Sequence, residues 1–376
     1  MRLTLLALAL FVTVTAAYAV GDQAYLGMFA ETSVMQIAGM PEAPPIPPGI
    51  DMPNIPGMEA MMSMGKPTRS FTVRLWSPGI APEGAAASIA PPAGLKQGNK
   101  LDLELYRPKA EKSESGDGES AQGEDGEIPD FTIKYYWGSS AKVKPGQPKV
   151  ISFKSLAPEA KQLMEKEQQA AMRGTSSYFY KPNWTTGYWP TDKQPGKIAQ
   201  DAVLAGKYTL TTNYCGNVEL DCPQNVNFLA PIKMSSPDLQ EPVDMDAAMR
   251  FKWDLIPNLL GSHATIMGME GKNTLIIWSS SEVWRENLMS VDWGYLQMAE
   301  VKQFVQEKVM MPGEMTEVTV PAGIFKNCDF VSMTMTGYGT GVARMDTQPL
   351  PRIQTKTKLT IQLGGKMAGE MEFEDN

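Results

Sequence analysis

The sequence predicts a mostly-β protein built from two antiparallel β-sandwich-like domains with one or two short helices. Apolar residues recur at every second position in several segments, as they do in half-buried antiparallel strands. Turn residues separate these segments at intervals typical of a sandwich. The chain has 376 residues, which is long enough for about two domains.

The first β-rich domain is expected at residues 69–232. Alternating apolar and polar residues occur in it at 71–76, 101–106 and 131–137. In each of these segments one set of alternate side chains is apolar, so each is predicted to be a strand with one buried face.

Two other segments of this domain are not strand-like. Residues 109–130 are rich in acidic side chains and contain no aromatic residue. Such a composition buries too little apolar surface to order itself, so we expect a solvated acidic loop. Residues 157–173 predict a helix, because Pro158 suits its first turn and Gly174 can end it.

A linker is expected at residues 233–246, where serines and prolines accompany acidic residues. The second β-sandwich domain is expected at 247–365, followed by a tail at 366–376. Residues 295–308 place apolar side chains at helical spacing, which predicts a short crossover helix. The strand-like segments of this domain are 249–253, 264–269, 274–278, 317–321, 330–335 and 353–363.

Residues 1–19 predict a signal peptide for export. Arg2 precedes an apolar run from residue 3 to residue 14, and Ala17 and Ala19 provide the small-x-small pattern of a cleavage site. The run is shorter than the roughly 20 residues that span a membrane. We therefore expect cleavage after Ala19, a periplasmic or secreted location, and no membrane insertion of the mature chain.

Residues 20–68 are expected to form a disordered arm, because this stretch is dense in proline, which fixes φ and lacks a backbone donor. Thioether sulfurs are soft ligands that favour Cu(I), so methionines in the arm are candidate metal ligands. The competing interpretation is ordinary core filling, since the chain has 26 methionines overall. The candidate metal ligands are Met58, Met61, Met62 and Met64.

Composition argues against several classes of function. With 42 acidic and 34 basic residues the net charge is −8, whereas a nucleic-acid surface needs a basic field. His263 is the single histidine, so a serine or cysteine triad would have to use it as its general base. The sequence contains no motif that names a reaction or a cofactor. We expect no cofactor, and the question of catalysis stays open with a non-catalytic role favoured.

An aromatic segment at residues 178–189 is the main candidate for ligand binding. Flat aromatic faces can stack on sugar rings, and polar neighbours can donate hydrogen bonds beside them. The competing interpretation is that these rings fill the junction between the two domains. The candidate residues are Tyr178, Tyr180, Trp184, Tyr188 and Trp189.

The three cysteines of an exported protein can form disulfides. Cys215 and Cys222 lie seven positions apart after a strand-like run, so they could close a disulfide-bonded turn. Cys328 is left over, and beside Phe330 it is expected to be a buried free thiol.

Residues 136–148 read Tyr-Trp-Gly-Ser-Ser-Ala-Lys-Val-Lys-Pro-Gly-Gln-Pro. This segment resembles one found in an uncharacterised family of exported bacterial proteins with no assigned activity. Segments similar to residues 183–190 and 227–232 occur in the same proteins. The resemblance implies an exported bacterial protein and supplies no catalytic or binding residues.

Taken together, these patterns predict an exported, non-catalytic interaction or structural module of the cell envelope. Its expected partner is a cell-envelope protein or a polysaccharide. The first alternative is a glycan-binding or glycan-processing protein that uses residues 178–189. The second alternative is copper handling by the methionine-rich arm.

Overall fold

The computed structural model describes residues 23–40, 64–107, 132–152, 183–285, 288, 291 and 293–365. The predicted mostly-β class is confirmed, because this part of the chain consists largely of strands. Four predicted segments lie outside the described residues: the signal peptide 1–19, the acidic loop 109–130, the helix 157–173 and the tail 366–376.

The elements follow the chain in a simple order. The strands are β1 (Tyr25–Ile37), β2 (Thr68–Ser77), β3 (Ala87–Ala90), β4 (Leu101–Tyr106), β5 (Thr132–Trp137), β6 (Lys149–Ser152), β7 (Thr185–Trp189), β8 (Gly206–Thr212), β9 (Val218–Cys222), β10 (Met234–Ser236), β11 (Met249–Trp253), β12 (Leu259–Glu270), β13 (Thr274–Ser279), β14 (Met311–Pro312), β15 (Glu317–Val320), β16 (Phe330–Gly339), β17 (Val342–Ala343) and β18 (Leu350–Gly365). The helices are the 3-10 helix η1 (Ala93–Leu95) and the α-helix α3 (Met298–Gln306).

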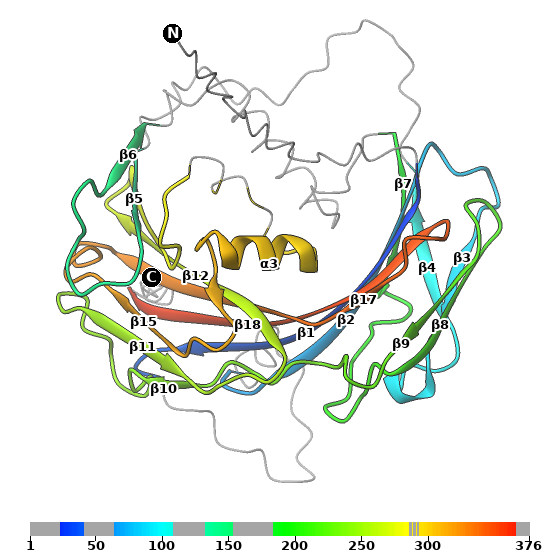
Figure 1. The fold of residues 1–376 in the computed structure, drawn as a ribbon, viewed down its shortest axis with the longest axis horizontal. Helices are drawn as coiled ribbons and strands as arrows, with labels where there is room; N and C mark the ends of the chain where they lie inside the picture. The colour runs from blue at the N-terminus through cyan, green and yellow to red at the C-terminus, as the bar shows by residue number, and fades with distance from the viewer. Residues whose placement is uncertain are drawn as a thin grey trace, which may run out of the picture.

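Most strands join one large mixed sheet of 15 strands, and β10, β11 and β15 form a separate small sheet. The order across the large sheet is β6-β5-β13-β12-β16-β18-β1-β2-β7-β4-β3-β8-β9, with β14 beside β12 and β17 beside β18. Most pairs are antiparallel, but β1 runs parallel to β18 and β5 runs parallel to β13. Figure 1 shows the sheet curving upward at both ends, with α3 on the concave inner face and the small sheet on the outer face.

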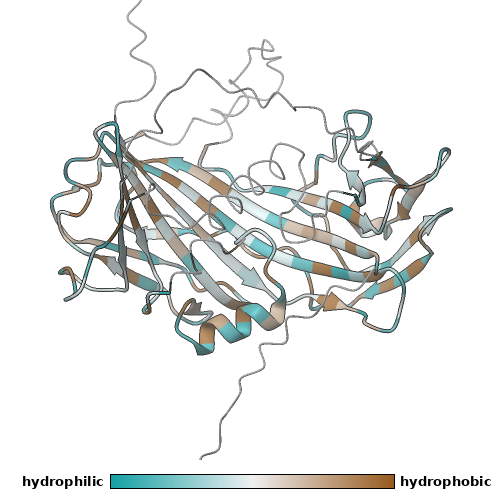
Figure 2. Cartoon of the chain, turned by 90° about the horizontal axis from the view of Figure 1, so that it is seen from above, coloured by the Kyte–Doolittle hydropathy of each residue, from teal (hydrophilic) through white to brown (hydrophobic). Residues whose placement is uncertain are grey.

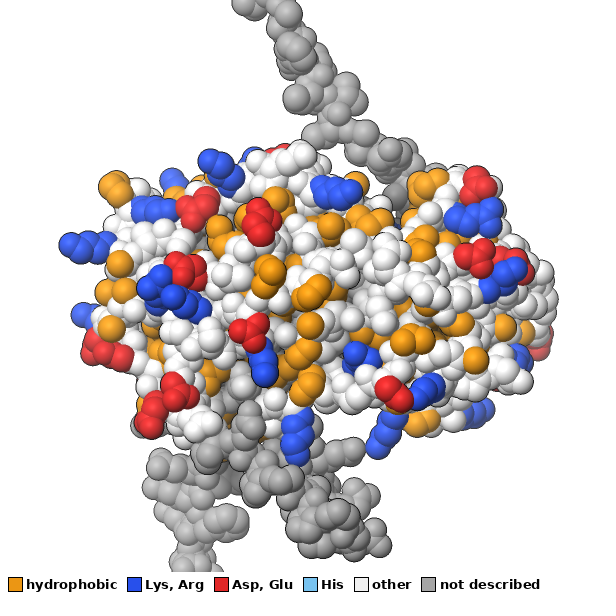
Figure 3. Space-filling view, turned by 60° about the horizontal axis from the view of Figure 1, so that its bottom comes forward, with side chains coloured by type: hydrophobic (Ala, Val, Ile, Leu, Met, Phe, Trp, Pro, Cys, Tyr) orange, Lys and Arg blue, Asp and Glu red, His pale blue; other side chains and the backbone are white. Residues whose placement is uncertain are grey.

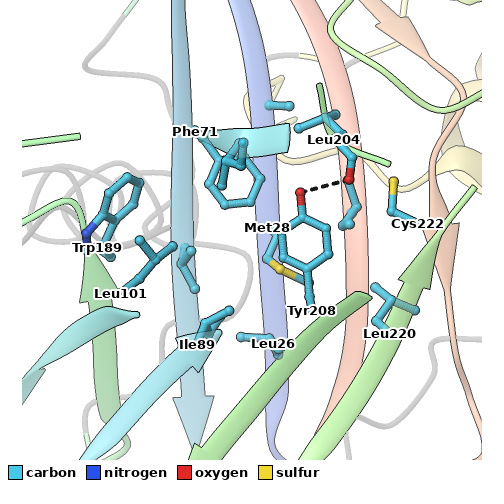
Figure 4. Packing of buried hydrophobic residues seen from close by; sticks show 14 of the residues in the cluster. Leu26, Met28, Phe71, Ile89, Leu101, Trp189, Leu204, Tyr208, Leu220 and Cys222 are labelled. Carbon is cyan, nitrogen blue, oxygen red and sulfur yellow. Dashed lines mark hydrogen bonds between the residues drawn. The ribbon is translucent and has the colours of Figure 1, made fainter. Parts of the chain in front are cut away.

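The outer face of the sheet carries two hydrophobic cores. In the first core, Phe71 of β2 stacks on Tyr208 of β8 with ring centroids 5.9 Å apart, and the Tyr208 hydroxyl donates a hydrogen bond to the Leu204 carbonyl at 3.0 Å. Figure 4 shows these side chains converging from several strands. In the second core, Phe251 of β11 and Trp278 of β13 are fully buried together with β16 and β18 side chains. Figure 2 shows the underlying alternation as bands of hydrophobic and hydrophilic residues along the strands.

The structure corrects the predicted domain boundaries. Residues 25–37 belong to the supposed disordered arm, yet they form β1 in the middle of the large sheet. The proline-dense stretch begins only at Pro41. Residues 26–30 of β1 are buried on both faces of the strand, and burial alternates only further along it. The predicted linker 233–246 is also part of the fold, because it contains β10 and because Met245 packs against the second core.

The two predicted domains share one sheet. The strand β5, expected in the first domain, pairs with β13 of the second, and β1 pairs with β18 over its full length. Each core is nevertheless a two-layer packing of the kind that a sandwich uses, so the predicted layers exist although the sheets are not separate.

The predicted crossover helix is confirmed as α3. Gln297 and Glu300 form a capping box at its start, with the Gln297 amide donating to Glu300 Oε2 at 2.7 Å. Such reciprocal bonds satisfy backbone donors that a helix start leaves unpaired. The helix lies close on β12, since a Cβ at Gly261 would come within 2.6 Å of Val305 Cγ2. A side chain at Gly261 would therefore force Val305 of α3 to shift.

Candidate functional site

The middle of the inner face is covered by residues 293–306. Trp293 stacks on His263 with centroids 3.8 Å apart and planes 4° apart, and the Tyr338 hydroxyl donates to the Trp293 carbonyl. Tyr295 meets Phe29 edge-on at 4.9 Å. These contacts divide the inner face into a covered centre and two ends.

His263 lies within the covered centre. Its Nε2 is 2.9 Å from the Ser279 hydroxyl, which also bonds the Tyr135 hydroxyl. Burial lowers the pKa of His263 to about 3, because a buried imidazole loses the hydration that stabilises its charge. A base with so low a pKa accepts a proton poorly at neutral pH. The His–Ser pair therefore acts as an internal hydrogen-bonded support beneath Trp293.

One end of the inner face is built around Tyr188. The strand register places Tyr188 of β7 between Arg74 of β2 and Glu104 of β4. The Arg74 guanidinium lies 5.9 Å from the centre of the Tyr188 ring. Burial and the hydrogen bond that the Tyr188 hydroxyl donates to the Glu104 carboxylate raise the pKa of Tyr188, and burial lowers the pKa of Arg74.

A cavity of about 430 Å³ adjoins the Tyr188 ring. The side chains around it combine an aromatic ring, prolines and carboxylates, which is a chemistry suited to hydroxyl-bearing ligands. Its lining residues are Glu104, Tyr188, Pro190, Thr191, Asp192 and Pro195.

The other aromatic candidates are placed differently. Trp189 is 1% exposed in the first core, where its Nε1 donates to Gln194 Oε1 at 3.0 Å. Trp184 is 5% exposed and clusters with Phe29 and Trp76. Both rings are already covered by protein, so of the described candidates Tyr188 alone offers a partly open face. Tyr178 and Tyr180 lie outside the described residues.

The opposite end of the inner face exposes apolar side chains. Met35, Met267 and Phe330 are 51%, 45% and 44% exposed. Each alternates with a side chain of the second core, namely Val34, Ile266 and Val331, so all three point to the inner side. Threonines separate them across the sheet, because Thr334 of β16 pairs with Thr360 of β18, which pairs with Met35. We call Met35, Met267 and Phe330 the apolar end.

The methionine candidates are only partly placed. Met64 lines a cavity with Met40 and Met234, whereas Met58, Met61 and Met62 lie outside the described residues. Sequence reasoning did not single out Met40 or Met234 as ligands. Their convergence depends on β10 lying beside the ends of β1 and β2, and no local pattern reports that.

The predicted disulfide is wrong, because Cys215, Cys222 and Cys328 are all free thiols. Cys215 lies in the turn after β8, whereas Cys222 pairs with Gly206 at the far end of the hairpin. An extended strand rises about 3.3 Å per residue, so β9 carries the two cysteines well beyond the roughly 7 Å limit for a bridge. Burial raises the pKa of Cys222 to about 11. Cys328 is half-buried rather than buried.

Surface charge, helix length and the grouping of metal-ligating side chains give three further findings. On the face drawn in Figure 3, lysines and arginines lie among aspartates and glutamates instead of forming one basic patch. Within the described ranges, no helix is long and apolar enough to cross a membrane. The same ranges contain no group of three or more His, Cys, Asp or Glu side chains placed to hold a metal ion.

The comparisons with known proteins do not add a family. No protein-family model matches the chain, and no curated protein matches it. The candidate sites therefore rest on the geometry of the inner face and of the cavities beside it.

Proposed function

We propose that the protein is an exported, non-catalytic interaction module of the cell envelope, and that its partner is a cell-envelope protein that docks on the apolar end. The observation that carries this proposal is the exposure of Met35, Met267 and Phe330 at the same end of the inner face. Large apolar side chains gathered on one face typically mark an interaction surface.

The chemistry of the apolar end suits a protein partner. Methionine side chains adapt to irregular apolar shapes, and the threonines between them can bond to backbone groups of a partner. Lys358 adds a positive charge on the same face, since it pairs with Thr336 in the register of β16 and β18. We therefore expect a segment with apolar side chains and a nearby acidic group.

Site-specific photo-crosslinking in the producing cell tests this proposal. A photoreactive residue at position 330 or 267 should give one discrete adduct, identified by mass spectrometry. The matched control is position 255, because Leu255 is also exposed, at 63%, but follows β11 on the other side of the molecule. Met267→Asp should abolish the adduct at position 330. No adduct at 330 and 267, or an equal adduct at 255, would contradict the proposal.

A second candidate function is glycan binding at the cavity beside Tyr188. The supporting observation is the open ring of Tyr188 next to Glu104 and Asp192. These carboxylates would repel an acidic polymer, so the expected ligand is a neutral polysaccharide. In affinity electrophoresis, Tyr188→Ala should lose retardation while Tyr106→Ala, at an exposed tyrosine of β4, should keep it.

A further inference from the structure

A cavity of about 310 Å³ lies where β1 ends, β2 begins and β10 passes beside them. Three methionines from segments far apart in the sequence reach it: Met40, Met64 and Met234. The remaining lining is mixed polar and apolar. It consists of Gln36, Ile37, Gly65, Ser235, Pro237, Asp238, Leu239 and Gln240.

The backbone beside two of these methionines is held by hydrogen bonds. The Met40 amide donates to the Ile37 carbonyl at 3.2 Å, and the preceding Gly39 amide donates to the Leu239 carbonyl at 3.0 Å. The Gly65 amide, which follows Met64, donates to the Met35 carbonyl at 2.8 Å. Both glycines have positive φ, a conformation open to glycine at little cost. The chain thus brings both methionines to the same cavity.

Met40 and Met64 differ from the core methionines, whereas Met234 also packs against the edge of the second core. Met28, Met333 and Met335 are fully buried among apolar side chains, where methionine serves as filler. Met40 and Met64 are half-buried and share their cavity with amide, hydroxyl and carboxylate groups. The described lining residues include the acidic Asp238 and no basic side chain. The charge of these lining residues therefore favours a bound cation over an anion.

We propose that Met40, Met64 and Met234 form a binding site for Cu(I). Thioether sulfur is a soft ligand that selects Cu(I) over harder cations, and three thioethers can surround one ion. Thioethers carry no proton to displace, so Cu(I) affinity should stay flat from about pH 6 to 8, unlike that of cysteine or histidine sites. This site is independent of the proposed docking of a partner on the apolar end. Of the four candidate ligands in the arm, it uses only Met64.

The test is Cu(I) titration of the full chain with ascorbate, without oxygen, against bicinchoninate as the competing chelator. We expect one equivalent to bind. Loss of even an outer-shell partner of a metal site costs about 10- to 100-fold in affinity, so Met40→Leu, Met64→Leu and Met234→Leu should each weaken binding by at least about tenfold. The control Met345→Leu, at a residue that is 75% exposed, should bind as the wild type does.

A variant with Met58, Met61 and Met62 all changed to leucine distinguishes this site from the arm. It should retain Cu(I) affinity if the cavity binds the ion. Retained affinity in the three cavity variants, together with its loss in the arm variant, would overturn the proposal, as would failure of the wild type to compete for Cu(I).

A second measurement does not depend on any variant folding. In the wild type labelled at the methionine methyl carbons, Ag(I), a redox-inert substitute for Cu(I), should shift the resonances of Met40, Met64 and Met234. Shifts confined to other methionines would also overturn the proposal.

Discussion

The two hydrophobic cores are closed in different ways, although one sheet contributes to both. The first core is closed by β3, β8 and β9 of the same large sheet, which bend round to cover the outer face of β1, β2 and β7. The second core is closed by the separate small sheet of β10, β11 and β15. A long curved sheet can therefore obtain its second layer either from its own edge or from a short sheet that is not hydrogen-bonded to it.

The boundary between the cores is a band of buried threonines on the strands that cross both. Met28 and Ile353 belong to the first core, and Val34 and Leu359 to the second. Between them, Thr32 donates a hydrogen bond to the Leu229 carbonyl at 2.8 Å, and the hydroxyl of Thr357 is buried without a hydrogen-bond partner in the described part of the chain. The cores are thus separated by polar side chains and joined by backbone.

The largest expected loss of unfolding free energy comes from removing a buried aromatic ring from either core. Phe251→Ala and Phe71→Ala remove fully buried rings, one from each core, and each should cost about 3–5 kcal/mol of unfolding free energy. Because β1 and β18 cross both cores, we expect a single cooperative transition in both variants, measured by urea unfolding with tryptophan fluorescence. Two separate transitions, of which only one shifts, would show that the cores unfold independently.

A smaller loss of unfolding free energy is expected at acidic pH. It comes from His263 of β12, a strand that also contributes to the second core. The folded pKa of His263, about 3, lies below the ordinary value of 6.5, so the unfolded chain binds the proton more readily. The contribution of neutral His263 to the unfolding free energy is fully present above the unfolded pKa. It is lost as pH falls through 6.5 toward 3. From pH 8 to 5.5 the loss should be about 1.4 kcal/mol.

His263→Gln is the matched control for this pH dependence. It should give a flatter stability curve over the same pH range, because the chain has no other histidine. An equal slope in urea unfolding of the two proteins would contradict the assignment.

The smallest effects, of opposite sign, are expected at the threonine band. Thr357→Val removes a buried hydroxyl that lacks a partner and should stabilise the protein by about 1 kcal/mol. Thr32→Val leaves the Leu229 carbonyl without its donor and should destabilise it by about 1–2 kcal/mol. Thermal unfolding compares the two variants directly. A loss of stability in Thr357→Val would show that its hydroxyl is satisfied.

Local alternation predicted the individual strands well. The segment 101–106 is β4 and 249–253 is β11 with the same bounds, because alternate burial is a property of neighbouring residues. The strand β1 was missed because prolines further along the chain dominated the interpretation of residues 20–68. The disulfide was predicted from spacing alone, and spacing does not report that β9 is extended between Cys215 and Cys222.

The candidate sites were less predictable than the strands. Tyr188 was identified by composition, but its neighbours Arg74 and Glu104 come from two other strands. Trp184 and Trp189 have the same composition signal, and tertiary packing buries them. Nothing local distinguishes an aromatic ring that faces a cavity from one that fills a core.

The sequence by itself determined the class of the fold, most strand positions and the crossover helix. These features depend on patterns among residues that are close together in the sequence. Only the tertiary structure decided that β1 pairs with β18, that one sheet serves two cores, and that Met40, Met64 and Met234 share a cavity. Those features depend on which distant surfaces pack together, and that choice is made by the burial of whole faces rather than by any short segment.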